Sequence, residues 1–127
     1  MEVILIDTDV LIDYKRAKQK EHAWLVTLSS QYEIAASTIT VFELLRGRNQ
    51  DEDLYWHSKF TEMRLLDFDY ACCTEAARIY KDLHASGQPI GVEDVLIAAV
   101  ALTNGLRLAT GNQRHFSRIA GLTLLVE

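Results

Sequence analysis

Residues 3–7 read Val3-Ile4-Leu5-Ile6-Asp7, four apolar residues followed by an acid. An apolar run without alternation is typical of a strand that is buried on both faces, as in the middle of a parallel sheet. A carboxylate at the end of such a strand is expensive to bury unless a partner compensates its charge. The stretch therefore predicts a central parallel strand with an acid at its carboxyl end.

Along the rest of the chain, short strand candidates alternate with helical stretches. We expect strands at residues 3–6, 32–36, 64–66, 106–109 and 122–126, and helices from about residue 9 and at 23–28, 40–46, 51–63, 69–86 and 92–103. This alternation indicates an α/β fold, with a roughly five-stranded parallel sheet covered by helices on both faces. Because no linker, repeat or low-complexity tract interrupts the pattern, we expect a single domain over residues 1–127.

The composition is that of a globular protein, with 49% hydrophobic and 24% charged residues. We see no signal-peptide pattern and no apolar run long enough to span a bilayer, so we expect a cytoplasmic protein without membrane contact. The adjacent Cys72 and Cys73 have no nearby His at metal-ligand spacing, which argues against a zinc site. The formal net charge of −5 argues against binding nucleic acid through bulk charge, but not through a local site.

Several polar residues are predicted to meet at one edge of the sheet, where the carboxyl ends of parallel strands and the N-termini of the covering helices lie. They are Asp7, Asp9, Glu43, Glu93, Asp94 and, after Thr110-Gly111, Asn112. Clustered carboxylates repel one another, and a divalent cation with oxygen ligands relieves that repulsion. The pattern predicts that Asp7, Glu43 and Asp94 bind Mg²⁺ or Mn²⁺ and favours phosphate-ester chemistry over acyl transfer.

Some of these residues also fit a purely structural role. Asp9 is compatible with a cap on the first helix, and Asn112 with a turn. The spacing Thr40-x-x-Glu43 matches a capping box, in which the glutamate reaches back to the first amide of the helix. Asp94 is favoured at a helix N-terminus by the helix dipole alone. The sequence leaves both interpretations open at these positions.

The basic residues follow the acidic segments along the chain. Without the five acids at the predicted edge the chain is formally neutral. Eight of its 13 Lys and Arg residues come after these segments: Lys15, Arg16, Lys18, Lys20, Arg46, Arg48, Arg114 and Arg118. We interpret this distribution as an acidic metal pocket surrounded by basic residues that meet phosphates. For Lys18 and Lys20 we favour an ordinary solvated surface.

Four segments together resemble the motifs of PIN-domain ribonucleases, and look most like the VapC-type toxins of toxin–antitoxin pairs. They are IDTDVLID (6–13), STITVFEL (37–44), GVEDVLIAA (91–99) and LATGNQRHF (108–116), in the family's order and over nearly the whole chain. Each segment is weak alone, but the combination is specific. The chain departs from the family in its last loop, where an acid is common and where Asn112 and His115 stand here.

The resemblance implies a metal-dependent endoribonuclease, with Mg²⁺ or Mn²⁺ held by Asp7, Glu43 and Asp94. It implies Asn112 as a further catalytic residue. The residues expected to bind the RNA substrate are Thr8, Thr110, Arg46 and Arg114. The resemblance also implies a homodimer, and a cognate antitoxin protein that blocks the active-site groove with a short segment.

Two other functions are open to this sequence. The N-terminal stretch with Asp7 and Asp9 also resembles the first motif of haloacid-dehalogenase-type phosphatases, and Ser37 resembles their second motif. However, the segment 110–112 offers no later acidic pair, and no lysine follows Lys81 to bind a phosphate. The third possibility is a PIN-like module that binds RNA or a protein partner without catalytic activity.

Overall fold

The computed structural model describes residues 1–47 and 50–127. Within these residues five strands form one sheet in the order β3-β2-β1-β4-β5, and every neighbouring pair is parallel. The strands are β1 (Val3–Ile6), β2 (Glu33–Ser37), β3 (Arg64–Leu66), β4 (Leu108–Ala109) and β5 (Leu124–Leu125). The sheet confirms the predicted α/β fold, with β1 at its centre.

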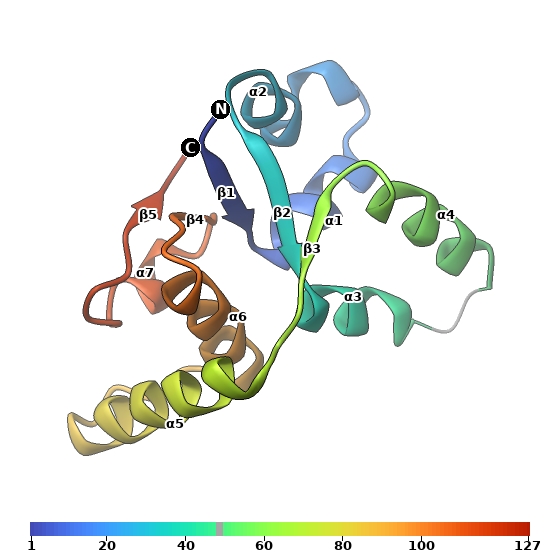
Figure 1. Cartoon of the computed structure of the whole chain (residues 1–127). Helices are drawn as coiled ribbons and strands as arrows, with labels where there is room; N and C mark the ends of the chain where they lie inside the picture. The colour runs from blue at the N-terminus through green and yellow to red at the C-terminus, as the bar shows by residue number, and fades with distance from the viewer. Residues whose placement is uncertain (48–49) are drawn as a thin grey trace.

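Helices cover both faces of the sheet (Figure 1). The described residues form seven α-helices and one 3₁₀ turn: α1 (Thr8–Arg16), η1 (Lys20–His22), α2 (Trp24–Gln31), α3 (Thr38–Leu45), α4 (Gln50–Phe60), α5 (Tyr70–Ala85), α6 (Val92–Thr103) and α7 (Gln113–Phe116). α5 and α6 pack on one face, while α1, α2 and α4 pack on the other. Among the described residues, no helix is long and apolar enough to cross a membrane.

The central strand β1 shows why its sequence is apolar at every position. Leu5 contributes to the core under α5 and α6, whereas Ile4 and Ile6 contribute to the core under α1, α2 and α4. All three side chains are fully buried. A strand covered on both faces has no solvent-facing position, so the alternation of a surface strand is lost.

The junction between β1 and α1 is shorter than expected, because a single residue, Asp7, separates the strand from the helix. Asp7 is the N-cap of α1, and its Oδ1 accepts a hydrogen bond from the Thr8 backbone N–H at 2.8 Å. Asp9 lies within the first helical turn, so its structural interpretation as the cap is wrong. Because β1 leads directly into α1, the position of Asp7 is set by two regular elements.

The helix α3 begins at Thr38, two residues earlier than predicted. Ser37 is its N-cap, and the Oγ of Ser37 accepts a hydrogen bond from the Thr40 backbone N–H at 3.1 Å. Thr40 is therefore inside the helix, where its side chain is fully buried. The capping box predicted from Thr40 and Glu43 is wrong, because the helix has already started at Ser37.

Other differences from the predicted boundaries arise at helix ends. The backbone N–H of Leu106 donates to Ala101 O at 2.9 Å, and Gly105 adopts φ 65°, so Leu106 closes α6 instead of extending β4. α4 ends at Phe60 because residues 61–63 form a turn bonded to residues three positions earlier. The short elements η1 and α7 were not predicted, since a single turn is too short to show a periodic pattern.

Candidate active site

The carboxyl edge of the sheet brings together side chains from four separate segments. Asp7 follows β1, Glu43 lies on α3, Asp94 lies in the first turn of α6, and Thr110 follows β4. Asp7 is 3% exposed, and the side chains of Glu43 and Asp94 are 18% and 26% exposed. The acids that the sequence predicted at this edge thus converge on one partly buried place.

Asp7 is held through both of its carboxylate oxygens. Oδ1 accepts the bond from the Thr8 backbone, and Oδ2 accepts a hydrogen bond from Thr110 Oγ1 at 2.9 Å. Thr110 Oγ1 in turn accepts a hydrogen bond from the Asn112 backbone N–H at 2.9 Å. These contacts orient the carboxylate and attach the loop after β4 to the end of β1.

Burial is the main influence on the ionisation of the three acids. It raises the pKa of Asp7 from 3.8 to about 7, and it raises the pKa values of Glu43 and Asp94 in the same direction. Hydrogen bonds from Thr110 to Asp7 and from Thr8 to Glu43 lower the pKa values of these acids. The charge of Asp94 raises the pKa of both Asp7 and Glu43. The edge therefore concentrates acids whose ionised form is disfavoured by burial and by mutual repulsion, and Arg46 and His115 offset this only in part.

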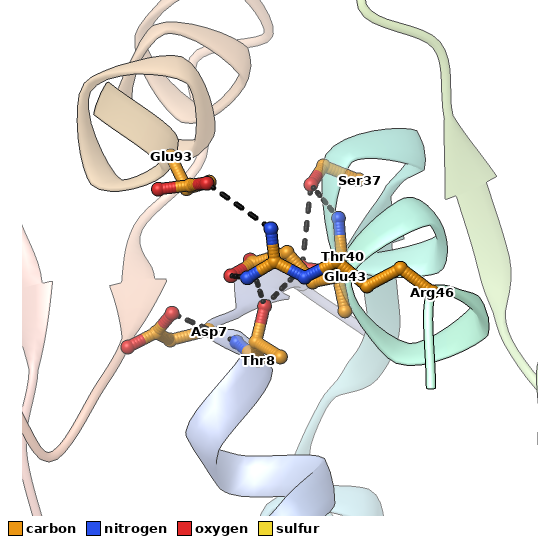
Figure 2. A network of polar contacts seen from close by, with 7 residues as sticks. All are labelled: Asp7, Thr8, Ser37, Thr40, Glu43, Arg46 and Glu93. Carbon is orange, nitrogen blue, oxygen red and sulfur yellow. Dashed lines mark hydrogen bonds and ion pairs between the residues drawn. The ribbon is translucent and has the colours of Figure 1, made fainter. Parts of the chain in front are cut away.

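A chain of hydroxyl groups supports Glu43 (Figure 2). Thr8 Oγ1 donates to Glu43 Oε1 at 2.8 Å and lies 2.9 Å from Thr40 Oγ1, which is 3.4 Å from Ser37 Oγ. Each hydroxyl has one proton, so the donation to the carboxylate sets the direction of the whole chain: Ser37 to Thr40, Thr40 to Thr8, and Thr8 to Glu43. A buried network of this kind holds the carboxylate in one orientation.

The loop after β4 reaches Asp94 through His115. The Nδ1 of His115 lies 3.7 Å from Asp94 Oδ2 and 3.0 Å from the side-chain nitrogen of Asn112. The pKa of Asp94 is raised by burial and lowered by this histidine. Asn112, predicted as a catalytic residue, therefore contacts His115 rather than an acid.

The donor chemistry of the site fits Mg²⁺ or Mn²⁺, which prefer carboxylate oxygens. As the side chains stand, no group of three or more His, Cys, Asp or Glu residues within 1–47 and 50–127 could hold a metal ion. Hydrogen bonds to protein groups engage both oxygens of Asp7 and one oxygen of Glu43. The site thus has suitable ligand types, although these carboxylate oxygens are engaged by protein hydrogen bonds.

Arg46 connects the acids of α3 and α6. Its guanidinium lies 3.8 Å from Glu43 Oε2 and donates to Glu93 Oε1 at 3.3 Å (Figure 2). The guanidinium also lies over the ring of Phe42. The Arg46 side chain is 52% exposed, so its ion pairs are accessible to solvent. Arg46 was predicted to bind substrate, and without RNA it is paired with two carboxylates of the protein itself.

The other basic residues have varied surroundings. Arg114, on α7, is exposed and makes no ion pair within the described part of the chain. Lys15 pairs with Glu52 at 2.9 Å, and Lys20 caps the end of α1. Arg48 lies outside the described residues. Of the two arginines predicted to bind the RNA substrate, Arg46 and Arg114, Arg114 is therefore the more available.

Sequence reasoning missed the supporting polar residues. Thr40 was assigned to a helix cap, and Ser37 was noted only for the phosphatase alternative, yet both are fully buried beside the site. Glu93 was expected at this edge of the sheet without a role of its own, and it pairs with Arg46. A signal was present, because hydroxyl residues within an apolar segment must find a hydrogen-bond partner when that segment is buried.

Comparison with known proteins identifies the family of this chain. The sequence model of the PIN domain family matches residues 4–122. Ribonuclease VapC1 of Rickettsia felis is 34% identical, with 96% of this chain and 94% of the relative covered. The tRNA(fMet)-specific endonuclease VapC of Shigella flexneri is 32% identical over 73% of this chain and 74% of its own. A crystal structure of DNA-bound VapBC from Salmonella typhimurium superposes with a TM-score of 0.84 at 26% identity, over 99% of this chain and 98% of that chain.

The chain therefore belongs to the PIN-domain family and, within it, to the VapC ribonucleases. This confirms the resemblance noted in the four sequence segments. The haloacid-dehalogenase alternative finds no support, because the family match covers the N-terminal Asp-x-Asp stretch on which it depended.

Proposed function

We propose that this chain is a metal-dependent endoribonuclease that hydrolyses RNA phosphodiester bonds, and that it is the toxin of a type II toxin–antitoxin pair. The observation that carries this proposal is the partly buried set of Asp7, Glu43 and Asp94 in a VapC-family chain. Two of its relatives are named as a ribonuclease and as a tRNA(fMet)-specific endonuclease. We propose RNA cleavage for this chain and assign it no particular RNA substrate.

Asp7, Glu43 and Asp94 would hold Mg²⁺ or Mn²⁺ through their carboxylate oxygens. When bound, the ion supplies Lewis-acid chemistry that makes a water molecule reactive near neutral pH and stabilises charge on the phosphate. The raised pKa values support this assignment, because a cation is what would favour the ionised form of these acids.

The remaining residues orient the acids and receive the substrate. Thr8 and Thr110 were expected to bind substrate, and their hydroxyl groups donate to Glu43 and Asp7, so we assign them an orienting role as well. Arg114 is available to meet a phosphate of the RNA, and Arg46 becomes available when it leaves Glu43 and Glu93. Asn112 acts by holding His115 beside Asp94.

Cleavage of RNA by purified protein, freed of any protein partner, tests the proposal. With Mg²⁺ or Mn²⁺ we expect cleavage of total RNA or of a tRNA pool, loss of cleavage with a chelator, and little cleavage by Asp7→Asn. We expect no comparable hydrolysis of a generic phosphomonoester. If wild type and Asp7→Asn behave identically with either metal, the proposal fails and the non-catalytic binding module replaces it.

Thermal unfolding gives a test of the metal that does not depend on activity. A ligand that binds only the folded state stabilises it by about 2.7 kcal/mol at 100 times its dissociation constant. We expect Mn²⁺ or Mg²⁺ to raise the melting temperature of the wild type and to have much less effect on Asp94→Asn. Equal shifts in both proteins would argue against these carboxylates as ligands.

The proposed cellular setting follows from the same relatives. We propose a cytoplasmic protein with a single domain over residues 1–127, which forms a homodimer and is inhibited by a cognate antitoxin. The similarity to a VapBC structure supports such a partner. Co-expression with the product of an adjacent small gene should suppress toxicity and give a stable complex on gel filtration.

A further inference from the structure

A cavity of about 560 Å³ lies beside the candidate active site, between α1, η1, the start of α2 and the loop after β4. This volume is within the range of about 300–1,000 Å³ that is typical of ligand pockets. Gly111 forms part of its wall, and the residue before it, Thr110, donates its hydroxyl proton to Asp7. The cavity and the acidic site therefore share one loop.

The far wall of the cavity is anchored to the end of α1. The ammonium group of Lys20 donates to three backbone oxygens there, Tyr14 O and Lys15 O at 2.9 Å and Ala17 O at 3.3 Å. These bonds satisfy carbonyl groups that a helix end leaves unpaired. They also hold η1, which carries the cavity residue His22, against α1. Lys20 thus has a structural role at this wall of the cavity.

The lining combines aromatic, cationic and acceptor groups. Trp24 and His22 contribute rings, Lys18 contributes an ammonium group, and Asp13 and Glu127 contribute carboxylates. Within the described part of the chain, neither Lys18 nor Asp13 makes an ion pair or a side-chain hydrogen bond. Their polar groups are available to a ligand.

We propose that this cavity binds an unpaired base of the RNA strand close to the bond that is cut. The proposal rests on the proposed ribonuclease function. Unpaired bases are recognised by stacking on aromatic rings and by hydrogen bonds to their edges, which Trp24 and Asp13 supply. A carboxylate only accepts hydrogen bonds, so Asp13 favours a base that presents an amino group. Lys18 meets the phosphate of the same nucleotide.

Tryptophan fluorescence tests stacking directly, without cleavage. The chain has two tryptophans, and Trp56 is only 3% exposed, so a ligand in the cavity reaches Trp24 alone. We would titrate a single-stranded RNA hexanucleotide of mixed sequence into the protein with a chelator present. The RNA should quench the wild type but not Trp24→Phe, which keeps an aromatic ring against the core and still fluoresces through Trp56. Absence of quenching in the wild type, or equal quenching in Trp24→Phe, would overturn the proposal.

Charge at the cavity is tested with a matched pair of variants. Lys18→Ala removes one phosphate contact. The slope of the logarithm of the binding constant for single-stranded RNA against the logarithm of the salt concentration should therefore become less negative by about 0.7. Lys81→Ala removes the same charge from an exposed position on α5, away from the cavity, and should leave this slope unchanged. Identical slopes in the two variants would contradict the role of Lys18.

The cleavage map tests base selection and separates this proposal from the proposed function. Asp13→Asn converts an acceptor into a group that also donates, so the preference for amino-bearing bases beside the cut should fall about fivefold or more while cleavage continues.

The possible outcomes separate the two proposals. If the wild type cleaves RNA and the cleavage map of Asp13→Asn is unchanged, the ribonuclease function stands and the base site is wrong. If the protein cleaves no RNA, the proposed function fails, and the fluorescence and salt experiments still decide the cavity. If Lys18→Ala and Asp13→Asn weaken binding of a purified antitoxin but not of RNA, the cavity is a protein-binding site and the proposal is overturned.

Discussion

The two edges of the sheet use charge in opposite ways, although β1, β2 and β4 contribute to both. At the amino edge, Glu2 precedes β1, Tyr32 precedes β2 and Arg107 precedes β4. Arg107 donates to both oxygens of Glu2, at 2.8 and 2.9 Å, and to the Tyr32 hydroxyl at 3.2 Å. The hydrogen bond from Arg107 lowers the pKa of Glu2. Folding thus favours the ionised form of this acid.

At the carboxyl edge the same strands deliver Asp7, Ser37 and Thr110, and no arginine pairs with Asp7 within the described residues. Burial raises the pKa of Asp7 to about 7, so folding disfavours its ionised form. At the amino edge, Arg107 compensates the charge of Glu2 within the protein. At the carboxyl edge, the ionised form of Asp7 needs a cation from outside the protein to compensate its charge. Strongly perturbed acids of this kind are typical of functional sites.

The largest expected contrast is in activity. Asp94→Asn should lower RNA cleavage by more than about a hundredfold, because losing a metal ligand exceeds the 10–100-fold loss typical of its supporting residues. Its melting temperature should hold or rise, since one repelling charge is removed. Glu2→Gln, the matched change at the amino edge, should leave cleavage unchanged. A large loss of stability in Asp94→Asn would instead indicate a structural role.

A smaller loss of activity is expected from the hydroxyl that orients Asp7. Thr110→Val removes the 2.9 Å hydrogen bond to Asp7 and should lower metal affinity and cleavage by about 10–100-fold. Thr110→Ser keeps the hydroxyl and should retain most of both. Metal titration followed by fluorescence or calorimetry, beside the cleavage assay, checks the pair. Equal activity in the two variants would remove Thr110 from the site.

The pH dependence of stability should differ between the edges. In metal-free buffer, Asp7 has a pKa of 3.8 when unfolded and about 7 when folded, so the folded state holds the proton more tightly. The contribution of Asp7 to the free energy of unfolding is complete below about pH 4 and is lost as the pH rises through 7. The total loss amounts to about 4 kcal/mol. Urea unfolding between pH 4 and 8 should show this decline in the wild type and a flatter profile in Asp7→Asn. Parallel profiles would contradict the raised pKa.

The smallest effect is expected at the amino edge, with the opposite sign. Because the pKa of Glu2 is lowered on folding, its contribution is present above the unfolded value of 4.5 and is lost as the pH falls. Glu2→Gln should therefore slightly lower the melting temperature at pH 7 and have less effect at pH 3. The difference at pH 7 should shrink in high salt, since exposed ion pairs are screened. No salt dependence would argue against the ion pair as the cause.

Local patterns in the sequence were sufficient to predict the five strands and the longer helices, and to predict which acids lie at the carboxyl edge of the sheet. The unbroken apolar run before Asp7 predicted a strand covered on both faces, and the alternation of strands and helices predicted a parallel sheet. These predictions depend on residues that are close in sequence, such as the apolar spacing of one strand or helix. The placement of Asp7, Glu43 and Asp94 at one edge followed from a general property of parallel sheets.

Only the tertiary structure decided how these residues are connected. Thr110 and Asp7 are 103 positions apart and Thr8 and Glu43 are 35 apart, yet each pair forms a hydrogen bond. Such contacts depend on the strand order β3-β2-β1-β4-β5 and on the register of neighbouring strands. The cavity around Lys18 likewise depends on tertiary packing, since residues from α1, α2, the loop after β4 and Glu127 all line it. By itself the sequence determined which groups reach the edge of the sheet, while packing between distant segments determined which of them touch, because side-chain geometry is set by neighbours in space.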